Sequence, residues 1–201
     1  MANNSLGGVE VGVISEDSEP FELVRIGATM AAHGVRYVLI GGVSGLFHGM
    51  AEYRTKDVDL LIQDNAENRT RLAAAMTDLN AVVARTVDRR PITGDDFTNG
   101  NTQWATDAGP VDILISAAGP QETIVVYADV EYGQEYFELE DGSRVPVASL
   151  DDVIRMKEAA DRYKDHLALP ELRRLRGDRY PQLATNQDPF GDFDIEDGAD
   201  D

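Results

Sequence analysis

Asp57 and Asp59 stand on either side of Val58, at the head of an apolar run that continues to Ile62. In a β-strand, residues two apart point to the same face, so this spacing predicts two carboxylates side by side. Carboxylates held together repel each other and lose hydration, so something must compensate their charge. Mg²⁺ does this with one or two carboxylates and the phosphates of a substrate. The pair therefore predicts a magnesium seat beside a phosphorylated substrate.

A glycine-rich segment, Gly41-Gly42-Val43-Ser44, lies upstream of the aspartates and follows an apolar run at residues 37–40. Glycines let a backbone approach a ligand closely, and a helix predicted to start near Ser44 offers free N–H groups to phosphate oxygens. Ser44 could donate its hydroxyl to a triphosphate oxygen or cap that helix, and the two roles are compatible. The segment is not a Walker loop, because no Gly-Lys-Ser/Thr follows, and its third glycine is misplaced for a Rossmann fingerprint. It predicts a phosphate cradle only because the paired aspartates are near.

Composition restricts the possible classes of protein. The chain has 201 residues, of which 42% are hydrophobic and 27% charged, as in one soluble globular domain. It has no cysteine, which excludes disulfides and thiolate metal sites and fits a cytoplasmic location. We expect no membrane association, because no apolar run approaches the roughly 20 residues of a membrane helix. The formal net charge of −19 argues against general nucleic-acid binding, which requires Lys and Arg.

Periodicity and turn signals predict the elements that position these residues. Helices are expected at residues 21–33, 44–48, 65–79, 149–162 and 170–176, and strands at 37–40, 56–62, 81–87, 102–106, 111–115, 122–129, 131–138 and 144–147. This order predicts an α+β fold with a mixed β-sheet and flanking helices. The predicted organisation is a flexible N-terminal segment (1–20), a core (21–148), a small C-terminal helical subdomain (149–179) and an acidic disordered tail (180–201).

Two further groups of charged residues are candidates for the site. Asp112 lies inside an apolar run at residues 111–115, where a charge costs free energy unless it is paired, so it either joins the site or caps a strand end. Basic residues concentrate in the C-terminal helices and could guide one nucleic-acid end, or they could be surface charges offset by acids. These are Arg155, Lys157, Arg162, Lys164, Arg173, Arg174, Arg176 and Arg179, with Arg85, Arg89 and Arg90 as a second cluster.

Several motifs together resemble a known superfamily. They are Gly41-Gly42-x-Ser44, His48-Gly49, Arg54-Thr55-x-Asp57-x-Asp59, Val111-Asp112-Ile113-Leu114, Ser149-Leu150-x-Asp152-x-Ile154-x-Met156-Lys157 and Arg162-x-Lys164-Asp165. They look like the polymerase-β-type nucleotidyltransferases, and are most similar to the AbiEii/MenT-like toxins of bacterial toxin–antitoxin systems. The resemblance covers roughly residues 34–175. One departure is that Arg54 directly precedes Thr55, where many relatives place one residue between them.

The resemblance implies a nucleotidyltransferase fold and a role for each motif residue. Asp57, Asp59 and Asp112 would hold Mg²⁺, and Asp112 would help to deprotonate the attacking hydroxyl. Lys157 would bind the triphosphate. Further nucleotide contacts would come from Gly41, Gly42, Ser44, Arg54, Arg162, Lys164 and Asp165. Lys164 and Asp165 could instead pair at the subdomain boundary. Thr55 would be a regulatory site, because phosphorylation there places about −1.5 to −2 charges in the metal seat.

The implied activity is transfer of a nucleoside monophosphate from an NTP to an acceptor hydroxyl. By resemblance the acceptor is a tRNA 3′ end, and the protein is a growth-inhibiting toxin with a possible cognate antitoxin. Two alternatives stay open at this point. The nucleotide could be transferred to a protein or to a small molecule such as an aminoglycoside, or the chain could be a catalytically silent nucleotide-binding module.

Overall fold

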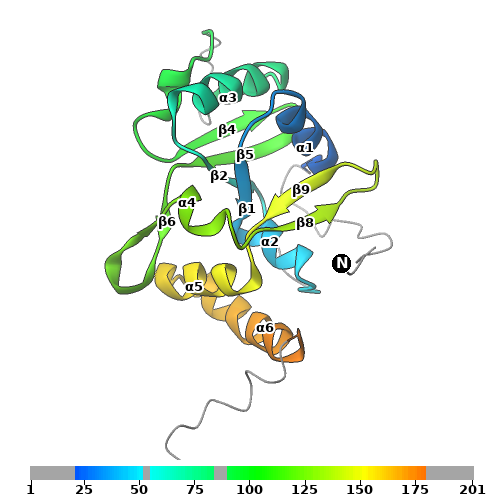
Figure 1. The fold of residues 1–201 in the computed structure, drawn as a ribbon, viewed down its shortest axis with the longest axis vertical. Helices are drawn as coiled ribbons and strands as arrows, with labels where there is room; N and C mark the ends of the chain where they lie inside the picture. The colour runs from blue at the N-terminus through cyan, green and yellow to red at the C-terminus, as the bar shows by residue number, and fades with distance from the viewer. Residues whose placement is uncertain (1–20, 52–54, 84–89, 180–201) are drawn as a thin grey trace, which may run out of the picture.

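A seven-stranded mixed sheet forms the centre of the computed structural model, which describes residues 21–51, 55–83 and 90–179 (Figure 1). The strand order is β3-β4-β5-β2-β1-β9-β8. The predicted terminal segments 1–20 and 180–201 and the predicted site residue Arg54 lie outside the described residues. Within the described part, the α+β fold with a mixed sheet and flanking helices is confirmed, whereas the division into core and subdomain stays a prediction.

Four strands at the middle of the sheet position the paired aspartates. They are β1 (Tyr37–Ile40), β2 (Val58–Ile62), β5 (Gly109–Leu114) and β9 (Arg144–Val147). β2 lies between β1, to which it is antiparallel, and β5, to which it is parallel, while β9 runs parallel to β1 on the other side. β3 (Val82–Val83), β4 (Thr102–Thr106) and β8 (Glu135–Glu138) complete the sheet through antiparallel pairs. The site aspartates therefore stand on interior strands, where neighbours fix their positions from both sides.

The middle of the sheet is buried on both faces, which is why β1 and β2 are apolar at nearly every position. Leu39, Leu60 and Ile113 pack on one side against α1 (Leu23–Ala32) and α3 (Ala66–Asp78). Alternate residues of the same strands, including Val38, Leu61 and the half-buried Leu114, pack on the other side against the C-terminal helices. Figure 1 shows α3 and α1 at one end of the molecule and the C-terminal helices at the other. Asp59 and Asp112 belong to the set that faces the C-terminal helices.

Helix α2 (Gly41–Phe47) differs from the prediction, because it starts at the glycines and not at Ser44. Ser44 is therefore inside the helix and is fully buried, and its hydroxyl donates to the carbonyl of Gly41 at 2.8 Å. The helix-capping role considered for Ser44 is therefore wrong, whereas its contact with a triphosphate stays a prediction. A serine inside a helix can satisfy its hydroxyl on a preceding carbonyl, and here burial leaves it that solution.

The segment predicted as a strand at residues 122–129 also folds differently. β7 (Ile124–Val125) is short and pairs only with β6 (Ala117–Ala118), as a separate two-stranded hairpin. The chain then turns into α4 (Tyr127–Val130), where Asp129 accepts a hydrogen bond from the backbone N–H of Val126 at 2.8 Å. The connections also contain two 3₁₀ turns, η1 (Gly94–Phe97) and η2 (Pro120–Glu122).

Two C-terminal helices close the face of the sheet that carries the aspartates. Ser149 caps α5 (Leu150–Ala160), as predicted, by accepting from the backbone N–H of Asp152. α6 (Tyr163–Arg179) begins seven residues before the predicted start and contains Pro170 within it. The expectation that Pro170 opens this helix is wrong. Ala168 and Leu169 before the proline and Leu172 after it are buried in the core between the sheet and the C-terminal helices, and this packing holds both segments in one helix. Among the described residues, none of the helices has the length and apolar character needed to cross a membrane.

Candidate active site

One row of side chains crosses three adjacent strands on the face that carries the aspartates. Asp59 of β2 is level with Asp112 of β5, and Asp112 is level with Gln103 of β4. Gln103 donates from Nε2 to Oδ2 of Asp112 at 3.1 Å. Asp57 immediately precedes β2, two residues from Asp59. The predicted convergence of the two aspartates with Asp112 is therefore explained by strand register.

Burial and like charge both act on these acids. Burial and the neighbouring charges of Asp57 and Asp112 together raise the pKa of Asp59 to about 7, although Lys164 and the N–H of Gly42 act in the opposite direction. Burial also raises the pKa of Asp112, with the hydrogen bond from Gln103 opposing it. The folded chain by itself therefore compensates the negative charge of this cluster only in part.

Gly41 brings the backbone of α2 against Asp59. A Cβ atom at Gly41 would lie 1.9 Å from Oδ2 of Asp59, and its φ of +69° is one that side chains other than glycine rarely adopt. The N–H of Gly42 donates a hydrogen bond to the same carboxylate. The backbone at Gly41 and Gly42 does allow a close approach, as predicted. However, the N–H of Gly42, a predicted phosphate ligand, donates to the Asp59 carboxylate.

A buried ion cluster lies at the junction of α5 and α6. The Asp165 carboxylate is fully buried and accepts from Lys157 Nζ at 3.3 Å and from Arg162 Nε at 2.7 Å. Burial lowers the pKa of Lys157, and the Asp165 charge opposes that effect. Burial alone would raise the pKa of Asp165, but hydrogen bonds and charge from Arg162 and Lys157 bring it below its usual value. Asp165 thus pairs with Lys157 and Arg162, and not with Lys164.

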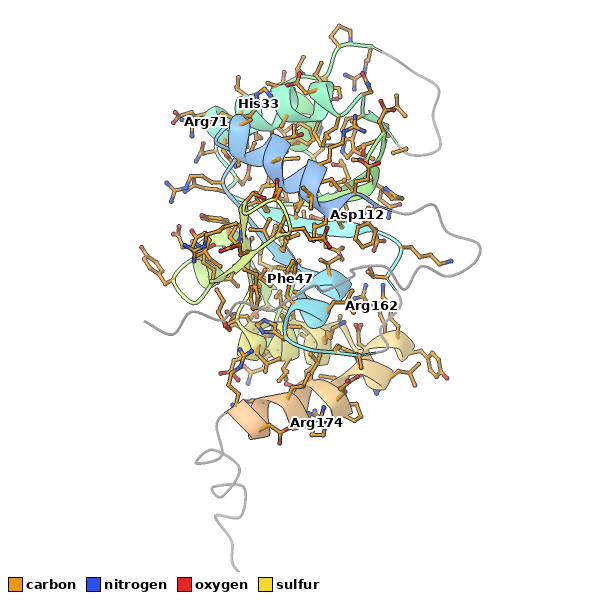
Figure 2. The ribbon with its side chains drawn as sticks, turned by 90° about the vertical axis from the view of Figure 1, so that its right-hand side faces the viewer. His33, Phe47, Arg71, Asp112, Arg162 and Arg174 are labelled. Atoms are coloured by element: carbon orange, nitrogen blue, oxygen red, sulfur yellow. The ribbon has the colours of Figure 1, made fainter. Side chains whose placement is uncertain are left out.

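A cavity of about 650 Å³ lies between the aspartates and this ion cluster. One part of its wall is acidic, with Asp57 and Asp59 beside Gly41 and Gly42. The lining also includes four basic residues, Lys56 next to Asp57 in sequence and Lys157, Arg162 and Lys164 from the C-terminal segment. A further part, the aliphatic wall, is formed by Leu114, Ala117, Ala118, Ile124, Val153, Met156 and Ala160. Asn101 and Ser116 also line the cavity. Figure 2 shows Asp112 and Arg162 on the same side of the molecule.

The cavity brings together most of the residues predicted for the site. Gly41, Gly42, Thr55, Asp57, Asp59, Lys157, Arg162 and Lys164 all line it. The hydroxyl of Thr55 donates to the carbonyl and to Oδ1 of Asp57, at 3.1 and 3.2 Å. Asp112, which is half-buried, and Asp165 are not among the lining residues, but Asp112 acts on Asp59 through its charge and Asp165 binds Lys157 and Arg162. Ser44 does not join the wall.

The residues fit a hard divalent cation that completes its shell with substrate oxygens. Carboxylates are the ligands Mg²⁺ prefers, and the cluster of Asp57, Asp59 and Asp112 carries negative charge that a cation would offset. Across residues 21–51, 55–83 and 90–179, however, no three acidic or histidine side chains stand as a ready-made metal site. The three-carboxylate metal site therefore stays a prediction.

Sequence reasoning did not find Gln103, Lys56 or the aliphatic wall. Gln103 could have been found from the strands predicted at residues 102–106 and 111–115, because a two-residue turn at Asp107 and Ala108 places it opposite Asp112. The aliphatic wall comes from segments between residues 114 and 160 that only tertiary packing brings together. Local periodicity carries no signal for that wall.

The basic residues of the C-terminal helices are largely neutralised by acids. Arg155 pairs with Asp152, Arg173 with Glu158, Arg174 with Asp178, Arg176 with Asp151 and Arg179 with Glu135, at 2.6 to 3.0 Å. In Figure 2, Arg174 lies away from Asp112 and Arg162. These pairs favour the interpretation as offset surface charges over that as a basic nucleic-acid face.

Neither a family model nor a curated protein matches the chain. Among solved structures, it is similar to the antibiotic-resistance factor ANT(2'')-Ia, with 16% identity, 81% of this chain and 91% of that chain covered, and a TM-score of 0.45. It is also similar to a putative nucleotidyltransferase from Thermotoga maritima, with 16% identity, 82% and 90% coverage, and a TM-score of 0.43. Structural similarity at 16% identity and with TM-scores of 0.45 and 0.43 assigns no activity to this chain.

Proposed function

We propose that this protein is a magnesium-dependent nucleotidyltransferase that moves NMP from an NTP to an acceptor hydroxyl. The observation that carries the proposal is the cavity, in which paired acids, several cations and an aliphatic surface line one space. In the reaction, the acceptor oxygen bonds to the α-phosphorus, and the bond from that phosphorus to the bridging oxygen of pyrophosphate breaks. The hydroxyl proton passes to a base, and pyrophosphate leaves.

The acids would serve the reacting phosphorus. Asp57 and Asp59 would hold Mg²⁺, with Asp112 completing the site. When bound, the metal supplies electrostatic stabilisation of the attacking and leaving oxygens. Asp112 would also accept the hydroxyl proton, and its raised pKa is in the direction that a proton acceptor requires. Gly41 allows this cluster to form against the backbone of α2.

The cations and the aliphatic wall match the two halves of a nucleotide. Lys157, Arg162 and Lys164 would bind the triphosphate, and Asp165 holds the first two in place. The aliphatic wall, with Ile124 66% exposed at its edge, would cover the nucleoside. Burial of apolar surface there would add affinity that an inorganic triphosphate cannot gain.

For the acceptor, the resemblance of the motifs to toxin nucleotidyltransferases supports a tRNA 3′ end and a role as the toxin of a toxin–antitoxin system. Phosphorylation of Thr55 by a cognate antitoxin would then place a dianion against Asp57. A second candidate is transfer to a small-molecule or protein hydroxyl. It is favoured by the ion pairs that neutralise the basic residues of α5 and α6.

Incubation with each of the four labelled NTPs, Mg²⁺ and total RNA, with protein and aminoglycoside acceptors in parallel, tests the proposal. Label in RNA supports the first acceptor and label elsewhere supports the second. NTP binding with no label in any acceptor would instead indicate a catalytically silent binding module and refute the transferase.

A competition experiment tests the division of the cavity. Lys157→Met should weaken binding of both an NTP and inorganic triphosphate. Ile124→Ala should weaken binding of the NTP alone, by about threefold to tenfold for the apolar surface lost. Leu167→Ala is a matched control, because Leu167 is exposed to a similar extent, 64%, and is absent from the cavity wall. Equal effects of Ile124→Ala on both ligands would place the nucleoside elsewhere.

A further inference from the structure

Gln103 is a polar residue that contacts the acid cluster from outside the cavity wall. It stands on β4, directly opposite Asp112 in the antiparallel pair of β4 with β5. Its Nε2 donates to Oδ2 of Asp112 at 3.1 Å, although its side chain is otherwise exposed to solvent. The strand pair fixes the backbone on both sides of this bond, so the amide meets the carboxylate without a long flexible reach.

The chemistry of an amide suits this place better than that of a cation. A lysine or arginine opposite Asp112 would also donate a hydrogen bond, but its charge would cancel negative potential that a metal needs. A glutamine orients the carboxylate by occupying one of its oxygens, and it adds no net charge. Among residues 21–51, 55–83 and 90–179, the only cations near the acid cluster are then those that line the cavity.

We propose that Gln103 is a positioning residue of nucleotidyl transfer, whose neutral amide holds the Asp112 carboxylate in place while leaving the charge of the acid cluster available to Mg²⁺. This inference rests on the proposed function. It separates two tasks, orientation and charge compensation, that a cation at this position would combine. It also predicts that the two tasks respond differently to two substitutions at one residue.

Gln103→Leu keeps the approximate size of the side chain and removes the donor. Loss of one hydrogen bond to a charged group, at an exposed position, should lower kcat about tenfold. The KM for NTP should stay within twofold, because the triphosphate is held by Lys157, Arg162 and Lys164. A surface residue with only a packing role on β4 would not produce this split between kcat and KM. A kcat within twofold of wild type would overturn the proposal.

Gln103→Lys keeps a donor and adds a charge. At pH 8 without metal, this variant should unfold at a higher temperature than wild type, because the ammonium offsets repulsion among the acids. With MgCl₂ and a non-hydrolysable NTP analogue, its stabilisation should be smaller than that of wild type. The Mg²⁺ concentration for half-maximal stabilisation should rise at least threefold. Gln103→Leu should leave this concentration within twofold of wild type.

Ala105→Lys is the matched control. Ala105 is exposed on the same face of β4, two residues and roughly 7 Å further along the strand. It should move the Mg²⁺ requirement less than half as far as Gln103→Lys. Equal shifts from the two lysines would show a general charge effect and overturn the specific role of Gln103. Wild-type stabilisation by Mg²⁺ without any transfer refutes the proposed reaction and the part of the Gln103 role that concerns kcat, whereas the metal arm still tests whether its neutral amide leaves the acid charge to Mg²⁺. Absence of both refutes the reaction and the role of Gln103 together.

Discussion

Asp59→Asn should make the metal-free protein more stable, and the gain should grow as the pH rises. Burial and the neighbouring charges of Asp57 and Asp112 raise the pKa of Asp59 from 3.8 to about 7. Asparagine has nearly the same shape and can still accept the hydrogen bond from the N–H of Gly42, but it carries no charge. The variant therefore removes a repulsive charge without opening a cavity.

The magnitude follows from the two pKa values. Between pH 3.8 and about 7, the folded state binds more protons at Asp59 than the unfolded state, so the stability of wild type falls as the pH rises through this window. Each pKa unit corresponds to about 1.4 kcal/mol, so the penalty that Asn removes is about 2 kcal/mol at pH 5.5 and about 4 kcal/mol at pH 8. The advantage of the variant should thus grow by about 2 kcal/mol across this range.

Urea unfolding at several pH values between 5.5 and 8 measures this advantage, and the range stays above the sequence pI of about 4.4. Asp95→Asn, at an exposed acid of η1, controls for the loss of one negative charge. A gain that is absent at pH 8, or that does not change with pH, would refute the burial and repulsion assigned to Asp59. Addition of Mg²⁺ with an NTP analogue should stabilise wild type at pH 8 and stabilise Asp59→Asn much less.

Four further outcomes follow from the same geometry. Asp57→Ala should lower transfer at least a thousandfold with an unchanged circular-dichroism spectrum, and retained activity would contradict the mechanism. Lys157→Met should raise the KM for NTP at least tenfold and lower the free energy of unfolding in urea by about 2 kcal/mol. This loss is smaller than that expected for a buried acid left wholly unpaired. An unchanged KM would remove Lys157 from the nucleotide site. Gly41→Ala should lower the free energy of unfolding by at least about 2 kcal/mol. The loss should be smaller in an Asp59→Ala background, because the clash with Oδ2 is then gone and only the cost of the positive φ persists. Equal losses in both backgrounds would show that the clash is absent. Thr55→Glu should abolish transfer while Thr55→Val retains most of it, and equal activities would argue against charge-based regulation there.

Much of the sheet could be predicted because its strands carry their own signal. The runs at β1 and β9 match their predicted bounds, and the hairpin of β4 and β5 has a turn marked by glycine and proline. α3 begins after Asn65, whose side chain accepts from the N–H of Asn68, as an N-cap should. In these segments local preference and tertiary packing agree, and the prediction succeeds.

The errors fall where tertiary structure overrides local preference. Pro170 and the glycines of α2 are poor helix residues, yet they lie within helices that are packed against the sheet or the C-terminal core. The strand predicted at residues 122–129 is apolar enough to be one, but Asp129 caps a short helix instead. At the site, spacing predicted the paired aspartates, and the resemblance of a local motif predicted Lys157. The aliphatic wall could not be located, because its members meet only after folding.

The arrangement of charge in the cavity explains how such an acidic chain can present cations to an anionic ligand. Lys157 and Arg162 could move toward Asp59 and neutralise it, which would leave neither group for a ligand. The buried carboxylate of Asp165 opposes this movement, because it binds both cations itself. Asp59 and Asp112 keep a raised pKa, and the two cations keep their positions beside Asp165. Keeping the acids and the cations apart costs free energy in the protein without a ligand. The arrangement matches a ligand that contacts the cations through its phosphates and the acids through a bound metal.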